Sequence, residues 1–339
     1  MANVEEWEFV TEVRLIRTIK EIPPGDLYTS GHRTCAGCGA ALGYRMLLKA
    51  AGPNTVVLGP TGCMYVANGH QFLSSPYSVP WYHTQLGAGG AAGVGTAAAF
   101  RVLMTKGKRR KEDVNVVVYG GDGGTSDIGL SGLSMAMSYD YKRFVYVLYD
   151  NESYANTGIQ ASSTTPWGAS TTFTPSGRIK RIGNPRMKKN VALIVAAHPG
   201  VRYVATATLF PPLDFINKAK KALEANGPAF IHLLVPCPKG WFVDPKYTVD
   251  LSSSALQTGL WVSWEYENGE FCLSYRPEPR KHVKKYLRMQ KRFEHLTDEQ
   301  VEEIEKMTAE EWNYWKEMDN RKKIILPWTA PPWPQQTSL

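Results

Sequence analysis

Residues 114–126 read VNVVVYGGDGGTS, a valine-rich run that stops at an aspartate between glycines. The apolar run predicts a strand at 114–119, and the stretch 126–138 has the pattern of a helix. A second apolar run at 144–149 predicts another strand, which ends at Asp150-Asn151. A strand, a glycine turn, a helix and a second strand in this order are typical of a parallel sheet covered by helices.

The same alternation of strands and helices continues on both sides of this stretch. Further strands are expected at 55–58, 203–206 and 230–235, with helices at 87–106 and 213–225. We therefore predict an α/β domain over residues 1–250, built on a doubly wound, mostly parallel sheet. Ligands bind at the carboxyl ends of the strands in such sheets, so the residues that follow the strands are expected to form one site.

Residues 251–339 have a different character. Alternation around Asn268-Gly269 predicts a β-hairpin at 260–275, and charged helical sequence follows at 281–316. A tail rich in Pro and Trp ends the sequence. We expect this C-terminal extension to pack on partner subunits. Residues 162–189, rich in Ser, Thr, Gly, Pro and Lys, are predicted to form a long functional loop.

The residues after the two central strands predict a magnesium and diphosphate site. Asp122 and Asn151 offer oxygen ligands, and the main-chain carbonyl of Ser153 is a reasonable third. The turn from Gly121 to Gly123 leads into a helix whose first amides can bind a diphosphate. A tight turn alone explains the glycines, but the added asparagine after the next strand favours a thiamine diphosphate site.

Four of the five cysteines lie in turns rich in Gly and Pro, where thiolates can face a shared centre. Cys35 and Cys38 lie in TCAGCG, Cys63 in PTGC and Cys237 in PCPKGW. A set of four cysteines binds either zinc or an iron–sulfur cluster, and the residues alone leave both open. Cys272, on the predicted hairpin, is interpreted as a small apolar side chain.

The net charge of +8 makes nucleic acid a partner to consider, but no nucleic-acid-binding motif is present. We expect the basic clusters at 106–111, 178–189 and 276–292 to be solvated faces or a surface for an acidic partner. No apolar run reaches the length that spans a membrane. The acidic start of the sequence lacks a signal-peptide pattern, so a cytoplasmic location is expected.

Several segments together resemble the β subunit of the 2-oxoacid:ferredoxin oxidoreductases, of which pyruvate synthase is the best-known type. The similar segments are TCAGCGA, GPTGC, VPWYHTQLG, GGDGGTSDIGLSGLSMA, YDNESYANTGIQ, STTPWGASTT and PCPKGW. The resemblance extends over residues 31–296 and implies a thiamine diphosphate-binding fold.

The resemblance also implies the cofactors and their ligands. One 4Fe–4S cluster is expected on Cys35, Cys38, Cys63 and Cys237. Mg²⁺ is expected on Asp122, Asn151 and the backbone oxygen of Ser153.

Two further residues are candidates for a place beside the cofactors. Asn156 matches a polar residue placed near the reacting thiazolium, although a structural hydrogen bond in a turn also explains it. The Thr61 hydroxyl lies where it can meet the diphosphate or the cluster.

The reaction implied is oxidative decarboxylation of a 2-oxo acid to acyl-CoA and CO₂, with electrons passed to ferredoxin. Pyruvate is the first choice of substrate, and branched-chain 2-oxo acids, phenylglyoxylate and oxalate are alternatives. Partner subunits of the α, γ and δ type are expected. In this family a partner supplies the glutamate that activates the thiamine ring, so the chain is expected to be inactive alone.

Two other classes of protein remain as alternatives. The first is a non-redox thiamine enzyme, such as a carboligase or decarboxylase, with a structural zinc on the four cysteines. The second is a non-enzymatic protein that binds a partner or nucleic acid, which only the positive charge supports.

Overall fold

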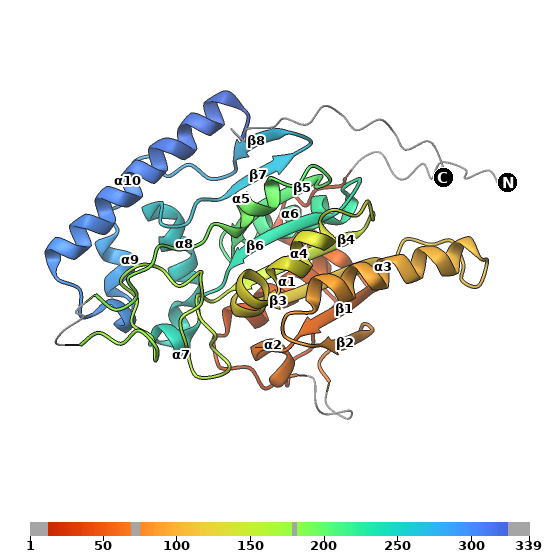
Figure 1. Cartoon of the computed structure of the whole chain (residues 1–339), viewed down its shortest axis with the longest axis horizontal. Coiled ribbons are helices and arrows are strands. Elements are labelled where there is room, and N and C mark those ends of the chain that lie inside the picture. Colours follow the sequence, from red (N-terminus) through yellow and green to blue (C-terminus); the bar gives the residue numbers. More distant parts are fainter. Residues whose placement is uncertain (1–12, 69–74, 178–181, 325–339) are drawn as a thin grey trace.

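One twisted sheet organises the part of the chain that the computed structural model describes, residues 13–68, 75–177 and 182–324. Within these residues the sheet has eight strands in the order β2-β1-β3-β4-β6-β5-β7-β8 (Figure 1). The parallel strands are β1 (Thr55–Pro60), β2 (Trp81–Thr84), β3 (Asn115–Gly121), β4 (Phe144–Asp150), β5 (Tyr203–Thr208) and β6 (Ala229–Leu234). The hairpin strands β7 (Trp264–Glu267) and β8 (Glu270–Leu273) are antiparallel.

The central strands are buried on both faces, as their unbroken apolar sequences require. Every residue of β4, β5 and β6 is buried. Alternate side chains enter two different cores because successive residues of a strand point to opposite faces. Val117 and Ile231 belong to one core, and Val118 and Phe230 to the other.

Helices cover both faces of the sheet. On one face, α1 (Gly39–Ala51) packs against α6 (Pro212–Glu224). On the other lie α3 (Gly89–Thr105), α4 (Leu130–Ala136) and α5 (Val191–Ala196). The shorter helices are η1 (Ile19–Glu21), α2 (Cys63–Val66), η2 (Gly123–Ile128), α7 (Pro238–Trp241), η3 (Pro245–Tyr247), α9 (Lys284–Arg288) and η4 (Lys291–Phe293). This arrangement confirms the predicted doubly wound α/β fold.

The C-terminal extension is continuous with this fold. The hairpin is confirmed, and its first strand β7 pairs with β5, so the hairpin extends the main sheet. The helical sequence expected at 281–316 is divided into α9, η4 and α10 (Asp298–Arg321). Thr297 and Gln300 form a capping box at the start of α10. Trp312 and Trp315 of α10 pack into the core of the sheet.

A few elements differ from the predicted ones. The helix after β3 starts with the π-helical turn η2 before α4 begins. Strand β2, with the sequence WYHT, and helices α1 and α8 (Thr248–Thr258) carried no prediction. In the described ranges, none of the helices has the length and apolar character needed to cross a membrane.

Candidate functional site

The carboxyl ends of the parallel strands bring the predicted ligands together. Strands β3 and β4 pair with Gly121 opposite Tyr149. Asp122 directly follows β3, and Asn151 directly follows β4. Both side chains are buried, because β1 and β6 flank the two strands and loops cover the strand ends. The strand order therefore puts one carboxylate and one amide at the same edge of the sheet.

Three polar groups meet there at hydrogen-bonding distance. The side-chain amide of Asn151 ends in an oxygen and a nitrogen whose positions can be exchanged. The one that faces Asp122 lies 3.2 Å from a carboxylate oxygen of Asp122 and 2.8 Å from the carbonyl oxygen of Ser153. If that atom is nitrogen, it donates to both oxygens, and if it is oxygen, three oxygens converge on one point. With nitrogen at that place the two contacts are hydrogen bonds, whereas three converging oxygens repel one another unless a proton or a cation lies between them. Glu152 has a φ of 64°, and this left-handed turn brings the Ser153 carbonyl back beside Asn151.

The environment of Asp122 also suits a cation. Burial, together with the negative charge of Asp150, raises the pKa of Asp122 well above its usual value. Its carboxylate accepts a hydrogen bond from the Thr164 hydroxyl at 3.2 Å. Within the described residues, the nearby Ser153 hydroxyl oxygen is buried without a hydrogen-bond partner. Bound positive charge would stabilise the ionised form of this carboxylate.

Glycine is required at the turn after β3 because an aromatic ring fills the space. A Cβ on Gly123 would lie 2.2 Å from the ring of Tyr154. The Tyr154 hydroxyl donates to the Gly123 carbonyl at 3.2 Å. A Cβ on Gly121 would likewise lie 3.0 Å from the Tyr149 hydroxyl. Glycine at 121 and 123 therefore allows the backbone of the turn to pack directly against Tyr149 and Tyr154.

A buried charge network lies behind the three oxygens, centred on Asp150. Its Oδ1 accepts from the Thr164 hydroxyl at 2.9 Å and from the Glu152 amide at 2.8 Å. Its Oδ2 accepts from His232 Nε2 at 2.9 Å and pairs with Lys188 Nζ at 2.7 Å. Burial alone would raise the pKa of Asp150, but Lys188 and His232 hold it well below its usual range. The backbone on either side of Asn151 is therefore fixed by ion pairs.

Glu152 extends this network to the C-terminal extension. Its carboxylate pairs with Lys188 Nζ at 2.6 Å and with the guanidinium of Arg292, which is 3% exposed. Lys188 and Arg292 belong to the basic clusters at 178–189 and 276–292, which were expected to be solvated faces or a surface for an acidic partner. For these two residues that prediction is wrong, because buried carboxylates from the ends of the strands bind their charges.

Trp241 joins the three oxygens to the segment that carries Cys237. The Trp241 indole N–H donates to the Asn151 carbonyl at 2.9 Å. The Trp241 amide donates to the Cys237 carbonyl at 2.8 Å, and the Gly240 amide donates to Cys237 Sγ at 3.2 Å. The guanidinium of Arg292 lies 4.0 Å from the centre of the Trp241 ring. PCPKGW thus connects two candidate cofactor sites.

The loop of the first two cysteines is fastened to the same segment. The Gly39 amide donates to the Pro236 carbonyl at 3.2 Å, and the Thr248 hydroxyl donates to the Gly37 carbonyl at 2.6 Å. A Cβ on Gly39 would lie 2.6 Å from the Pro236 oxygen. Glycine at this position therefore allows TCAGCG and PCPKGW to come into backbone contact, although about 200 residues separate them.

The four thiols interact electrostatically. Burial raises the pKa of Cys38 to about 11, with further increases from the negative charges of Cys237 and Cys35. Burial raises the pKa of Cys63 strongly, and Cys237, Cys38, Asp122 and Cys35 add to it. Cys63 therefore lies within the electric field of both the other cysteines and the aspartate. Such thiols stay protonated unless positive charge stabilises their thiolates.

The cysteines do not form a closed site for one ion. Among the residues that the structure describes, no three His, Cys, Asp or Glu side chains stand where a single metal ion could be held. Cys272 is exposed on β8, opposite Glu265. It is separate from the other four cysteines, which all lie around the carboxyl ends of β1 and β6 and the start of α1.

Thr61 and Asn156 lie at the edge of the site. The Thr61 hydroxyl is 2.5 Å from His83 Nε2 and 3.2 Å from the Thr84 carbonyl oxygen, so it holds β1 and β2 together. Asn156 is exposed, in the loop that follows Ser153. Among the described residues, neither side chain forms a hydrogen bond with Asp122 or Asn151.

Sequence reasoning missed the supporting network. Asp150 precedes Asn151 directly, and a charged residue at the buried end of a strand is a recognisable signal. The partners of Asp150 gave no such signal, because Lys188, His232 and Arg292 are far away in sequence. Trp241 was quoted as part of PCPKGW, but nothing in the sequence pointed to its bond with Asn151.

Comparisons with known proteins identify the family of the chain. Residues 60–233 match the family described as thiamine pyrophosphate enzyme, C-terminal TPP binding domain. The chain is 48% identical over 285 residues to the pyruvate synthase subunit PorB of Methanothermobacter thermautotrophicus, covering 84% of this chain and 96% of that protein. It is 40% identical over 300 residues to the ketoisovalerate oxidoreductase subunit VorB of Pyrococcus furiosus, covering 88% and 94%.

A solved structure of the 2-oxoglutarate:ferredoxin oxidoreductase from Magnetococcus marinus is also similar, with 26% identity and a TM-score of 0.49 over 62% of this chain and 67% of that one. The family match and the relatives cover most of the chain, including both central strands and their ends. The chain therefore belongs to the family of thiamine diphosphate-binding β subunits of the 2-oxoacid:ferredoxin oxidoreductases, together with PorB and VorB.

Proposed function

We propose that this chain is the subunit of a pyruvate:ferredoxin oxidoreductase that holds thiamine diphosphate, Mg²⁺ and one 4Fe–4S cluster. The observation that carries the proposal is the meeting of Asp122, Asn151 and Ser153. Ligands of an octahedral Mg²⁺ at its usual bond length lie about 2.9 Å apart along each edge. The separations of 3.2 and 2.8 Å around the Asn151 amide fit two such edges.

In this assignment the chain's residues position the diphosphate. Asp122 supplies charge to the cation, Asn151 turns its amide oxygen toward it, and Ser153 contributes its carbonyl. Gly121 and Gly123 allow the main chain to approach the phosphates, where the first amides of η2 and α4 lie. When bound, thiamine diphosphate supplies the electron-rich carbon that cleaves a 2-oxo acid. The buried network under Asp150 keeps these ligands in place.

The 4Fe–4S cluster is assigned to Cys35, Cys38, Cys63 and Cys237. Support comes from the mutual electrostatic influence of the thiols and from the backbone contact between their loops. The Gly240 amide donates a hydrogen bond to Cys237 Sγ. Hydrogen bonds to the sulfur ligands of iron–sulfur clusters tune the reduction potential of the cluster. The bond from Trp241, in the segment of Cys237, to Asn151 supports a position of this ligand set near the proposed cofactor site.

Pyruvate is proposed as the substrate, with coenzyme A as acyl acceptor and ferredoxin as electron acceptor. Four pyruvate synthase subunits are 45–48% identical to this chain, against 39–40% for three ketoisovalerate oxidoreductase subunits, and a fifth pyruvate synthase subunit is 38% identical. Asn156, exposed beside the site, is assigned to the substrate side, where a partner subunit would cover it. The C-terminal extension is proposed to contribute to contacts with partner subunits.

A substrate panel on the whole complex tests this function. We expect reduction of ferredoxin with pyruvate and coenzyme A, and slower reduction with branched-chain 2-oxo acids. Activity with oxalate that needs no coenzyme A would overturn the acyl-transfer step. The purified chain without its partners should be inactive with every 2-oxo acid, because half of the active site is missing.

Metal analysis of the Cys63→Ala complex tests the cluster ligands separately. We expect a loss of iron, sulfide and visible absorbance relative to the unchanged complex. A Cys272→Ala complex is the matched control and should keep all three. Full iron content in the Cys63 variant would contradict the ligand set, and zinc without iron in the unchanged complex would favour a non-redox thiamine enzyme.

A further inference from the structure

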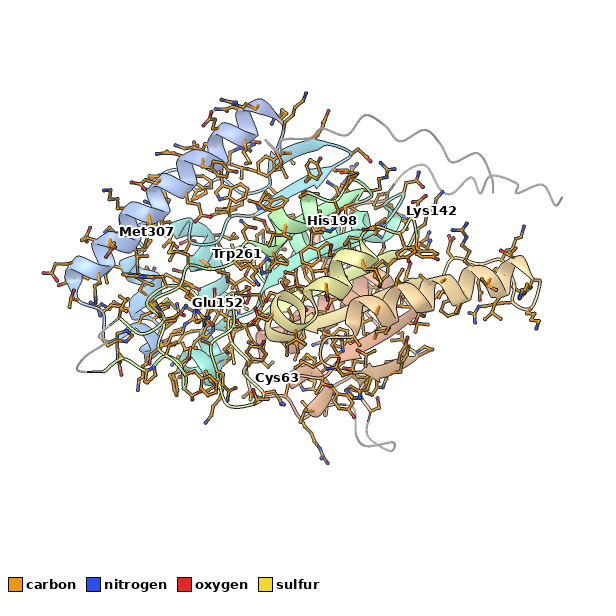
Figure 2. The ribbon with its side chains drawn as sticks, viewed as in Figure 1. Cys63, Lys142, Glu152, His198, Trp261 and Met307 are labelled. Carbon is orange, nitrogen blue, oxygen red and sulfur yellow. The ribbon has the colours of Figure 1, made fainter. Side chains whose placement is uncertain are left out.

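A buried tyrosine hydroxyl lies between the turns of the two candidate cofactor sites. Tyr149, near the end of β4, is 1% exposed. A Cβ on Gly62 would lie 2.9 Å from its hydroxyl oxygen, and a Cβ on Gly121 would lie 3.0 Å from the same atom. Gly62 precedes Cys63, which Figure 2 labels at the edge where the strands end, and Gly121 precedes Asp122. One oxygen atom is therefore packed against both turns.

The electrostatic surroundings of this hydroxyl show which groups it faces. Burial raises the pKa of Tyr149 well above its usual value, and the negative charge of Cys63 raises it further. The Met64 amide, which donates toward the hydroxyl oxygen, lowers this pKa, and the charge of Asp122 raises it. The oxygen is thus held between Gly62 and the Met64 amide, the two neighbours of Cys63 in the chain.

Aromatic packing fixes the ring that carries this hydroxyl. The centre of the Tyr149 ring lies 4.8 Å from that of Tyr119, which stacks in turn on Tyr44 at 4.3 Å. The Tyr119 hydroxyl donates to the Ala40 carbonyl at 2.8 Å, two residues after Cys38. All three rings belong to one closely packed core, so the Tyr149 oxygen has a fixed place and only its hydrogen can turn.

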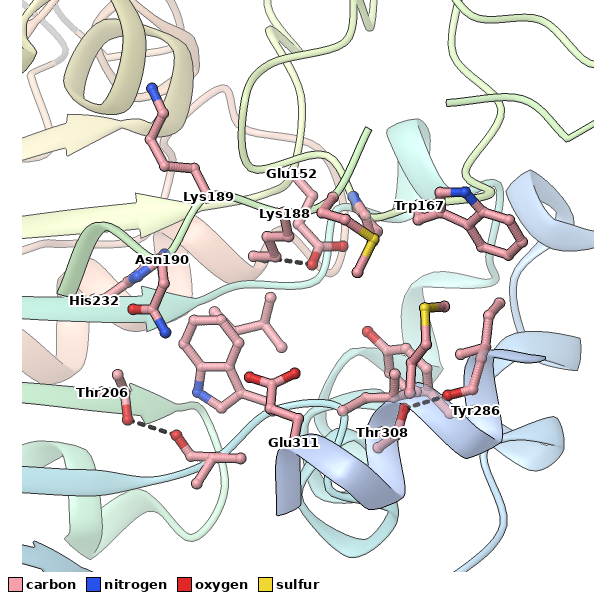
Figure 3. Close-up of a pocket in the computed structure, with 18 of the residues that line it drawn as sticks. Glu152, Trp167, Lys188, Lys189, Asn190, Thr206, His232, Tyr286, Thr308 and Glu311 are labelled. Carbon is pink, nitrogen blue, oxygen red and sulfur yellow. Dashed lines mark hydrogen bonds and ion pairs between the residues drawn. The ribbon is translucent and has the colours of Figure 1, made fainter. Parts of the chain in front are cut away.

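The hydrogen of this hydroxyl is free for a further bond. In the described part of the chain, no group accepts a hydrogen bond from Tyr149. The charged groups that follow along the chain are paired: Glu152 lies 2.6 Å from Lys188, and both line a cavity beside the C-terminal helices (Figure 3). A buried donor without an acceptor costs free energy, which a nearby acceptor can recover. A sulfur atom at Cys63 is an acceptor of this kind.

We propose that the Tyr149 hydroxyl donates a hydrogen bond to a sulfur atom of the cluster assigned to Cys63 and thereby raises the reduction potential of that cluster. This inference rests on the function proposed above. Both chain neighbours of Cys63 contact the oxygen, against one neighbour of Asp122, so a sulfur is favoured over the diphosphate as acceptor. Reduction adds negative charge to the cluster and strengthens a bond donated to its sulfur. Tyr149 is therefore a positioning residue that makes the cluster easier to reduce.

A redox titration of the full-length chain, purified with its cluster and without oxygen, tests the proposal. In Tyr149→Phe the midpoint potential should fall. At the midpoint of the unchanged chain, the ratio of reduced to oxidised cluster should then be about fivefold lower in the variant. Tyr146→Phe is the matched control, because it removes a buried hydroxyl of the same strand that bonds to Thr125 at 3.0 Å, and its midpoint should not change. An unchanged midpoint in Tyr149→Phe, or an equal fall in both variants, would overturn the proposal.

Two replacements of nearly equal size separate the hydrogen bond from packing. Tyr149→4-aminophenylalanine keeps a donor in the place of the hydroxyl, and Tyr149→4-fluorophenylalanine fills the same place without a donor. We expect the amino variant to keep a midpoint near that of the unchanged chain and the fluoro variant to lower it as Tyr149→Phe does. Equal midpoints in the two would exclude the hydrogen bond. This pair decides the question if Tyr149→Phe does not retain its cluster.

Iron analysis separates a failure of this inference from a failure of the proposed function. If the unchanged chain holds iron and sulfide but the midpoints are equal, only the hydrogen bond from Tyr149 is wrong. An unchanged chain without iron and sulfide would overturn the cluster and this inference together. Weaker binding of thiamine diphosphate with magnesium by Tyr149→Phe, at an unchanged midpoint, would contradict the proposal and assign the hydroxyl to the diphosphate instead.

Discussion

At the scale of single residues, the central feature is a buried carboxylate that suits a cation. Asp122 is 1% exposed, and burial raises its pKa well above the usual value. In a metal-free chain this residue either stays charged in a poorly solvated place or takes up a proton, and both cost free energy. A carboxylate that suits a cation at this position therefore lowers the free energy of unfolding of the metal-free chain, a trade-off that is common in binding sites.

This opposition gives a prediction for Asp122→Asn. The variant should be more stable than the unchanged chain without metal, by about 1–3 kcal/mol, because a neutral amide replaces a buried carboxyl that must either carry charge or take up a proton. Magnesium with thiamine diphosphate should stabilise the unchanged protein and have no effect on the variant. Thermal unfolding with and without both cofactors measures this. A variant that is still stabilised by the cofactors would contradict the assignment of Asp122 as a ligand.

Trp241 offers a second test at the residue scale. Trp241→Phe leaves the Asn151 carbonyl buried without its donor, at a cost of about 1–3 kcal/mol. Because that carbonyl is part of the turn that carries the ligands, the affinity for magnesium should fall as well. Trp264→Phe, which changes a buried tryptophan away from the site, is the control for packing and should leave the magnesium affinity unchanged.

At the scale of elements, the attachment of β7 to the sheet combines backbone pairing with a buried carboxylate. The Tyr203 hydroxyl donates to Glu265 at 2.6 Å, and Lys221 pairs with the same carboxylate at 2.8 Å. Burial alone would raise the pKa of Glu265, but Lys218, Lys221 and Tyr203 lower it below its usual value. The hairpin is thereby fixed to β5 by charge as well as by hydrogen bonds.

The lowered pKa predicts a dependence of stability on pH. A carboxyl whose pKa is lower in the folded chain than in the unfolded chain stabilises the fold fully at pH values above its unfolded pKa, which is about 4.3 for glutamate. This stabilisation is lost as the pH falls from the unfolded pKa toward and through the folded pKa. Glu265→Gln should therefore be less stable than the unchanged chain at neutral pH, and its stability should fall less on acidification. Urea unfolding at neutral pH and near pH 3.5 compares them. Parallel losses in the two proteins would contradict this role of Glu265.

At the scale of the whole molecule, one ion-pair network connects the sheet to the C-terminal extension. Glu152, at the strand ends, pairs with Arg292, which lies 140 residues further along the chain. Arg292 also stacks on Trp241, which bonds to Asn151. The extension therefore helps, from within the same chain, to fix the residues proposed to bind magnesium.

Arg292→Met should show this coupling. Removing one partner leaves buried negative charge on Glu152 and should destabilise the chain by about 3–5 kcal/mol. Adding Glu152→Gln to the same chain should restore part of the loss, since the unpaired charge is removed with it. Chemical unfolding of the two single variants and the double variant gives the coupling free energy. Additive losses would mean that the pair is not coupled.

The sequence was sufficient for those parts of the fold and the site that depend on neighbours along the chain. The strands at 114–119 and 144–149 and the hairpin turn at Asn268-Gly269 followed from local patterns. The meeting of Asp122 with Asn151 followed from strand ends and parallel pairing. Lys188 and Arg292 could not be identified this way. A basic cluster in a sequence is typical of a solvated surface, and their pairing with buried carboxylates depends on residues far away in the chain.

Reduction of the cluster by pyruvate tests the central claim most directly. The whole complex, kept free of oxygen, is mixed with pyruvate, coenzyme A, thiamine diphosphate and magnesium, and cluster reduction is followed by electron paramagnetic resonance. The account predicts a pyruvate-dependent signal in the unchanged complex. It predicts no such signal in an Asp122→Asn complex that retains its full iron content. An equal signal in that variant, or no pyruvate-dependent signal in the unchanged complex, would contradict the account.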